Sequence, residues 1–175
     1  HEVSILFVDA SLGKEVTCYP NFSVRTAFLA DSRDETFDAV VATWWKTYYE
    51  MFLLGASRYL YFVQSDERRF YPPDHPYWPW IERTYRDPTV GYVTEAQWIR
   101  NWLQRDYGIE AQYAPNGVDT SIFNPGNRSY AVLPRRVLIE GPLGQDIKRM
   151  PETYGVIERL YRRFPDMQVE LVTSE

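Results

Sequence analysis

Short apolar runs that alternate with amphipathic stretches constrain the fold of this chain more than any other feature. The run 3–8 predicts a buried strand, and the runs 39–43 (AVVAT) and 59–63 (YLYFV) predict two more. Between the last two, apolar residues recur at helical spacing over 46–54, and Gly55 follows as a helix stop. Strands that alternate with helices at this spacing are typical of a parallel sheet. We therefore predict an α/β fold, a parallel sheet with helices on its faces.

The middle of the chain predicts a loop and then one more strand and helix. Prolines crowd the stretch 70–88, so we expect most of it to be loop. A strand at 90–93 leads to Thr94 and Gln97, which have the spacing of a capping box. The helix that they begin is expected to end near Gly108 and to carry one apolar face, made of Trp98, Ile99, Trp102 and Leu103. A further strand is predicted at 110–114.

A polar link divides the chain into two parts. After it, the strand 136–140, the helix 151–164 and the strand 168–172 form one β-α-β unit, whose helix should turn Tyr154, Ile157, Leu160 and Phe164 inward. A unit of about 40 residues has difficulty in burying a core of its own. We therefore predict most of an N-terminal domain at 1–124, a hinge at 125–135, and the beginning of a second, incomplete domain at 136–175.

Composition excludes several classes of protein. The net charge of −5 provides no basic field that would attract nucleic acid. A lone cysteine, Cys18, excludes an internal disulfide, and with only two histidines we expect no metal site. No apolar run reaches the roughly 18 residues that span a bilayer, and no leader sequence is evident. These features predict a cytoplasmic protein and leave open a peripheral position at the inner face of a membrane.

The aromatic content of 17% has two interpretations. Aromatic faces stack on sugar rings, and they also fill cores and domain interfaces. Composition alone does not decide between the two.

The most specific segment is PNGVDTSIFNP, at 115–125. Asn116 and Gly117 allow a tight turn with positive φ, and the Asp119 side chain can accept backbone N–H groups in an Asx-type turn. Phe123 is expected to fill an apolar gap. By itself, the segment could be no more than a well-formed turn between a sheet and a linker.

The segment also resembles the junction signature of retaining GT-B glycosyltransferases of family four. The stretch 61–72 (YFVQSDERRFYP) is similar to a segment of the polysaccharide- and rhamnan-type members. The resemblance implies two Rossmann-like domains that face each other across a cleft, the first for the acceptor and the second for the nucleotide sugar. It implies a retaining reaction with no metal and no cofactor beyond the nucleotide-sugar substrate. It also implies a glycan or lipid-linked acceptor.

The resemblance places the donor phosphates after the first strand of the second domain. There the family has Gly-Arg-Leu followed by Lys, and this chain has Gly141, Pro142, Leu143 and Lys148. Pro142 replaces the Arg, so either Arg149 takes its role or the clamp is weaker. Lys148 and Arg149 could also be a solvated pair in front of a helix. A cationic pair at a helix N-terminus can stabilise a diphosphate leaving group.

On the acceptor side, the loops at the carboxyl ends of the parallel strands should face the cleft. This selects Thr43 and Trp44 after one strand, and Gln64, Asp66 and Glu67 after the next. Gln64 stands nearest to a histidine of the family, and Asp66 or Glu67 could orient an acceptor hydroxyl. Gln64 and Asp66 are the predicted catalytic residues. Asp66 and Glu67 could instead be helix-capping or first-turn acids.

Two features of the family do not occur in the chain. We expect its glycine-rich loop before His1 and its paired glutamates after Glu175, so that residues 1–175 alone should be inactive. Two other classes stay open, a sugar-nucleotide epimerase with the GT-B architecture and a non-catalytic α/β interaction module. Donor, acceptor, linkage and oligomeric state do not follow from the sequence.

Overall fold

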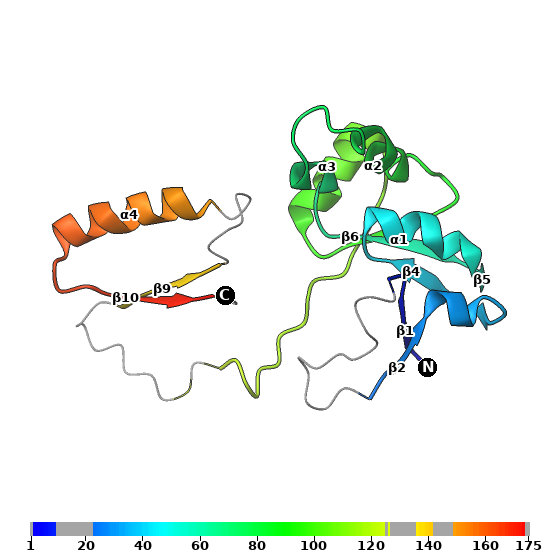
Figure 1. The fold of residues 1–175 in the computed structure, drawn as a ribbon, viewed down its shortest axis with the longest axis horizontal. Coiled ribbons are helices and arrows are strands. Elements are labelled where there is room, and N and C mark those ends of the chain that lie inside the picture. Colours follow the sequence, from blue (N-terminus) through cyan, green and yellow to red (C-terminus); the bar gives the residue numbers. More distant parts are fainter. Residues whose placement is uncertain (1, 10–22, 125, 127–135, 142–148, 174–175) are drawn as a thin grey trace. The chain divides into compact units, whose positions relative to one another are not determined.

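The computed structural model describes residues 2–9, 23–124, 126, 136–141 and 149–173. The chain forms two compact units, residues 1–117 and 118–175. Figure 1 shows the helices and strands of each unit. Both units mix helices with parallel strands, and the predicted α/β class is confirmed.

The main sheet of the first unit has four parallel strands in the order β4-β6-β7-β8. They are β4 (Val40–Ala42), β6 (Tyr59–Val63), β7 (Gly91–Thr94) and β8 (Gln112–Tyr113). In the central strand β6, Tyr61 and Val63 are buried and pair with Tyr92 and Thr94 of β7. Burial of a central parallel strand explains why the run YLYFV shows no polar alternation.

Two shorter pairs of parallel strands belong to the same unit. One joins β1 (Ser4–Phe7) to β2 (Arg25–Phe28), and the other joins β3 (Thr36–Phe37) to β5 (Gly55–Ala56). A 3₁₀ turn, η2 (Leu29–Ser32), follows β2. Gly55 therefore begins a strand, where the sequence predicted a helix stop. The preceding helix ends earlier, as α1 (Trp45–Glu50) followed by the 3₁₀ turn η3 (Met51–Leu53).

The proline-rich stretch contains more regular structure than its composition predicted. A 3₁₀ turn, η4 (Glu67–Phe70), ends at its first residue, and a helix, α2 (Trp78–Thr84), lies within it. Pro79 lies in the first turn of α2, where a missing backbone N–H breaks no helical hydrogen bond. α2 buries Ile81 against the core that lines the sheet. Most of 70–88 is loop and turn, as predicted, and α2 is the helix in it that the sequence did not predict.

Helix α3 (Gln97–Tyr107) begins later than the capping-box prediction placed it. Ala96 is the N-cap, without a side-chain cap, whereas Thr94 is the buried last residue of β7. Ile99, Trp102 and Leu103 are buried as predicted, but Trp98 is half exposed. The helix ends at Gly108, which has φ of 69°, the left-handed conformation of a helix C-cap.

The second unit contains β9 (Arg136–Glu140), α4 (Met150–Arg163) and β10 (Gln168–Val172). β9 and β10 are parallel, and Gln168 pairs with Arg136. These elements agree closely with the predicted β-α-β unit. Tyr154 is an exception on α4, because it is exposed where the sequence predicted an inward side chain. The predicted hinge lies outside the described residues except for Gly126, and the proposed domain limits stay predictions.

Candidate functional site

The carboxyl ends of β4 and β6 bring two of the predicted loops together. β4 pairs with β6 in parallel, so Thr43 and Gln64, which directly follow these strands, lie at the same edge of the sheet. The Gln64 side-chain amide Nε2 donates a hydrogen bond to the Thr43 carbonyl at 3.0 Å. Both residues are exposed. Polar groups from two loops therefore meet where ligands bind in open parallel sheets.

Thr47 fixes the first of these loops. Its hydroxyl oxygen accepts hydrogen bonds from the backbone N–H groups of Thr43 at 3.2 Å and Trp44 at 3.1 Å. Trp44 keeps 39% of its surface exposed. The Lys46 ammonium lies 5.0 Å from the centre of the Trp44 ring, within range of a cation–π interaction. The loop thus presents an exposed aromatic side chain beside a positive charge.

Asp66 is the N-cap of η4, one of the two roles left open by the sequence. Its carboxylate accepts hydrogen bonds from the Arg68 backbone N–H at 3.2 Å and from the Arg68 guanidinium at 2.9 and 2.8 Å. This ion pair is partly buried. The Asp66 side chain is therefore held by Arg68 at the carboxyl edge of the sheet.

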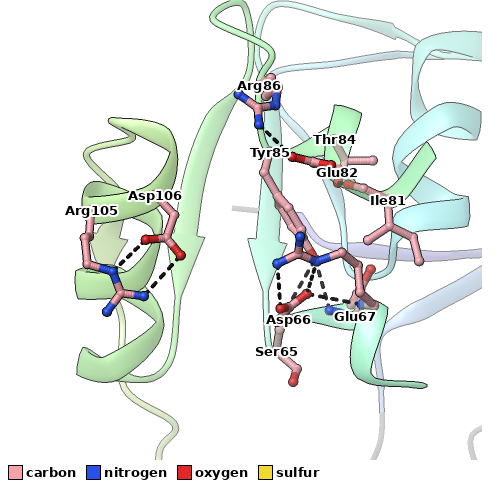
Figure 2. Close-up of polar contacts among 11 residues, drawn as sticks. Ser65, Asp66, Glu67, Ile81, Glu82, Thr84, Tyr85, Arg86, Arg105 and Asp106 are labelled. Atoms are coloured by element: carbon pink, nitrogen blue, oxygen red, sulfur yellow. Dashed lines mark hydrogen bonds and ion pairs between the residues drawn. The ribbon is translucent and has the colours of Figure 1, made fainter. Parts of the chain in front are cut away.

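Glu67 is a buried carboxylic acid, with only 2% of its surface exposed. Its Oε2 accepts hydrogen bonds from the Trp45 backbone N–H at 2.8 Å and from the Tyr61 hydroxyl at 2.7 Å. The Glu67 backbone N–H donates to the Tyr85 hydroxyl at 3.1 Å. Figure 2 shows the side chain of Tyr85, the residue that directly follows α2, extending toward Asp66 and Glu67. Glu67 therefore connects the two edge loops with the core.

The environment of Glu67 makes its charge unfavourable near neutral pH. Burial raises the pKa of Glu67 to about 7, although hydrogen bonds from Tyr61 and Trp45 favour the ionised form. Burial also holds the pKa of Tyr61 and of Tyr85 above the ordinary value, so both hydroxyls stay protonated donors. Because its carboxylate is turned into the core, Glu67 is suited to holding the loops rather than to contacting a substrate.

Sequence reasoning missed three of the residues that shape this edge. Tyr61 and Tyr85 hold Glu67, and Lys46 lies against the exposed aromatic side chains. Tyr61 could have been noticed as a hydroxyl inside an otherwise apolar strand, since such a group needs a buried partner. For Tyr85 no local pattern gives the partner, because its contact with Glu67 joins segments 18 residues apart in the chain.

The predicted donor-side residues are only partly described. Gly141 directly follows β9, and its backbone N–H donates to the Val172 carbonyl at 3.2 Å. Arg149 is the N-cap of α4 in a left-handed conformation, with φ of 53°, and forms an exposed ion pair with Glu152 at 3.1 Å. Lys148, Pro142 and Leu143 lie outside the described residues. Gly141 and Arg149 thus lie on either side of the predicted phosphate-binding loop.

The junction segment forms the predicted Asx-type turn. Asp119 Oδ1 accepts hydrogen bonds from the Ser121 backbone N–H at 2.9 Å and from the Ser121 hydroxyl at 2.6 Å. These bonds hold the pKa of the Asp119 carboxyl below its ordinary value. Two details differ from prediction. Gly117 does not adopt positive φ, and Phe123 is 70% exposed and fills no gap within the described residues. Asn116 is exposed as well.

Two further observations concern the described part of the chain. It contains no group of three or more His, Cys, Asp or Glu side chains arranged to hold a metal ion. None of its helices is both long and apolar enough to cross a bilayer.

Comparison with known proteins gives one partial relationship. The chain is 30% identical over 94 residues to a phosphatidyl-myo-inositol mannosyltransferase of Mycolicibacterium smegmatis, a match that covers 53% of this chain and 24% of that enzyme. The chain thus spans about a quarter of the length of the relative it matches. No protein-family model matches the chain, and no solved structure matches it. The mannosyltransferase similarity supports a distant relationship to glycosyltransferases.

Proposed function

We propose that the protein carrying this chain transfers a sugar from a nucleotide-sugar donor to a hydroxyl of a glycan or lipid-linked acceptor. The observation that carries the proposal is the 94-residue similarity to a mannosyltransferase. The parallel sheet with polar loops at one carboxyl edge is compatible with it. The finer assignment, a retaining enzyme of the GT-B type, rests on the junction segment at 115–125.

The acceptor side of the proposed site is the edge formed by the loops after β4 and β6. Gln64 donates through Nε2 to Thr43, which orients the amide and leaves Oε1 as an acceptor for a substrate hydroxyl. Asp66, held by Arg68, is the carboxylate nearest to Gln64 in the sequence, and it could accept a proton from that hydroxyl. Trp44 offers an exposed ring face beside these groups. Glu67 stabilises the two loops through its buried hydrogen bonds to Trp45 and Tyr61, and we propose no contact between Glu67 and substrate.

The donor side is the loop between β9 and α4. A nucleoside diphosphate leaves with increasing negative charge on its phosphate oxygens, and cations and helix N-termini stabilise that charge. Lys148 and Arg149 precede the first turn of α4, and Gly141 ends the preceding strand. We propose that Lys148 and Arg149 bind the diphosphate. No metal or other cofactor is needed for this role.

The test is an assay of nucleoside diphosphate release by the protein that carries this chain. Uridine- and guanosine-diphosphate sugars would each be incubated with a panel of oligosaccharide and polyprenyl-phosphate acceptors. The proposal expects release that depends on an acceptor, together with a product larger by one sugar. Release without any enlarged product would indicate a hydrolase, and conversion of the donor to an epimeric nucleotide sugar without release would indicate an epimerase. Absence of release with every donor would contradict the assignment.

A further inference from the structure

A polar and aromatic pocket lies in the first unit, away from the candidate site. Its volume is about 520 Å³, and three aromatic side chains, two arginines, an aspartate and a proline form its walls: Tyr48, Tyr49, Phe52, Arg83, Arg86, Asp87 and Pro88. None of these residues belongs to the acceptor or donor groups described above. The pocket is therefore a separate feature that the proposed function does not use.

The topology places this pocket at the amino ends of the strands. Phe52 lies in η3, ahead of β6, and its ring centre is 5.0 Å from that of Tyr59, the first residue of β6. Asp87 and Pro88 lie in the connection that leads into β7. Because β6 and β7 are parallel, both connections meet at the edge opposite to Gln64. The two sites are thus at opposite ends of one sheet.

The aromatic walls provide a preformed stacking surface. The Tyr48 ring is perpendicular to those of Tyr49 and Phe52, with interplanar angles of 84° and ring centres 5.3 and 5.4 Å apart. Tyr48 is buried and forms the base, whereas Phe52 is 42% exposed. The Tyr49 hydroxyl donates to the Trp80 carbonyl at 2.8 Å, which fixes its ring. An apolar ring face of a ligand can therefore contact Phe52 without rearrangement of the base.

Polar groups line the same pocket, and their positions are fixed. Asp87 Oδ2 accepts a hydrogen bond from the Tyr48 hydroxyl at 2.7 Å, and its Oδ1 accepts from the Thr89 hydroxyl at 2.6 Å. Partial burial works to raise the pKa of Asp87, but the bonds from Thr89 and Tyr48 outweigh it, and the pKa lies below its ordinary value. Asp87 is therefore a charged acceptor at neutral pH.

The charges around the pocket balance. Arg86 pairs with Glu82 at 2.6 Å, while Arg83 forms no salt bridge with another described residue and favours the charged form of Asp87. Glu82 does not line the pocket but neutralises Arg86, and this leaves one guanidinium, that of Arg83, and one carboxylate, that of Asp87, for a ligand. A balanced set of donors and acceptors does not select an anion. It suits a neutral ligand with many hydroxyl groups, because guanidinium donates to hydroxyl oxygens and carboxylate accepts from hydroxyl hydrogens.

We propose that this pocket binds a neutral saccharide unit, stacked on Phe52 and hydrogen-bonded to Arg83 and Asp87. The volume lies within the range of small-molecule sites. Pyranose rings combine an apolar face with hydroxyl groups at the edge, and the pocket offers the matching surfaces. Binding here needs neither a nucleotide sugar nor the groups at the carboxyl edge.

The experiment is a heteronuclear NMR titration of residues 1–175 with neutral gluco-, manno- and galacto-configured disaccharides. A disaccharide with a uronic acid and inorganic phosphate are the charged probes. We expect saturable shifts of the Phe52 and Asp87 backbone amides with at least one neutral disaccharide. The Gln64 side-chain amide reports separately on the opposite edge, so the shifts of Phe52 and Asp87 should follow a binding curve of their own whether or not Gln64 also shifts.

Variants separate the pocket from general changes in the protein. Phe52→Ala and Arg83→Ala should each weaken the saccharide affinity by about tenfold, the effect of losing one stacking or charged contact. Leu53→Ala and Arg33→Ala are matched controls, since both residues are exposed and neither lines the pocket. The controls should bind as the unchanged chain does, and thermal unfolding should show that all four variants fold.

Several results would overturn the proposal. They are no saturable binding of any neutral disaccharide, shifts at Gln64 without shifts at Phe52, or unchanged affinity in folded Phe52→Ala. Tighter binding of the uronate or of phosphate in the same pocket would overturn the assignment to a neutral ligand. Because the titration measures binding without a nucleotide, its outcome is independent of whether the protein transfers sugars.

Discussion

The carboxylate of Glu67 accepts a hydrogen bond from the backbone N–H of Trp45 at 2.8 Å, although 22 residues separate the two in the chain. Trp45 begins α1 at the end of the loop after β4, and Glu67 begins η4 after β6. One buried acid therefore holds together the two loops that present Trp44 and Gln64. Its protonation should affect the stability of the unit.

Glu67→Gln should change how stability depends on pH. In the folded chain the pKa of Glu67 is about 7, above its ordinary value of 4.5, so the native state binds more protons than the unfolded state between these values. The contribution of Glu67 to the free energy of unfolding is then fully present below pH 4.5 and is lost as the pH rises through 7. The free energy of unfolding should change by no more than about 3.5 kcal/mol, since a shift from 4.5 to about 7 corresponds to about 1.4 kcal/mol per pKa unit.

Urea unfolding of the chain at pH 5 and pH 8 measures this effect. The unchanged chain should lose more free energy of unfolding between the two pH values than Glu67→Gln does, because glutamine keeps an oxygen acceptor for Trp45 and Tyr61 but does not titrate. Glu110→Gln, at an exposed position, is the control and should follow the unchanged chain. Equal pH dependence in Glu67→Gln would show that Glu67 is not the group responsible.

Gly108→Ala should destabilise the first unit by about 1 kcal/mol, although open space surrounds the site. Gly108 ends α3 with φ of 69°, a conformation that a side chain with a Cβ atom adopts only with strain. Gly117→Ala is the matched control, since nothing lies within 4 Å of an added Cβ and φ is not positive. Thermal unfolding should place the control within about 0.5 kcal/mol of the unchanged chain. A Gly108→Ala variant as stable as the control would contradict the argument.

Much of the fold could be predicted because most elements follow local patterns. β6, β9, β10 and α4 agree with their apolar runs to within a residue or so. The failures have tertiary causes. α2 forms in a proline-rich stretch because Ile81 and Tyr85 are buried in the core and Pro79 falls in the first turn. The pairing of β3 with β5 joins strands too short to show a pattern.

The candidate site could be predicted only as a location. The parallel order of β4 and β6 determines that Thr43 and Gln64 meet, and alternation of strands and helices is enough to expect this. Whether Asp66 or Glu67 faces outward depends on where the chain turns after β6. Glu67 is held at the core by two tyrosines, and one of them, Tyr85, directly follows α2, an element that the sequence did not predict.

Gln64→Ala should lower kcat/KM for the acceptor by about tenfold in the protein that carries this chain, which corresponds to one lost hydrogen bond near 1.4 kcal/mol. The same change removes the bond to the Thr43 carbonyl and leaves the neighbouring loop less fixed. Gln97→Ala, on the exposed start of α3, is the control and should have no effect. Initial rates of nucleoside diphosphate release at varied acceptor concentration provide the measurement. Unchanged rates in Gln64→Ala would remove Gln64 from the proposed site.

Lys148→Ala should reduce kcat/KM by roughly a hundredfold, the effect of losing one group that stabilises charge in a transition state, about 2.7 kcal/mol. Lys148 precedes Arg149 and the first turn of α4, so its ammonium would add to the partial positive charge of that helix end. The lysine should contribute little to folding, and thermal unfolding should change by less than about 0.5 kcal/mol.

Arg149→Ala tests whether Arg149 takes the role of the family's arginine, since Pro142 occupies that position in this chain. If Arg149 has taken over the role of the family's arginine, the two variants should be impaired to a similar degree. The Arg149 ion pair with Glu152 is exposed, so we expect its loss to change the free energy of unfolding only slightly. An intermediate result, with only Lys148→Ala impaired, would make Arg149 a helix-capping surface residue. Full activity of Lys148→Ala would contradict the donor-site assignment, because the predicted phosphate contact would then contribute nothing to the transition state.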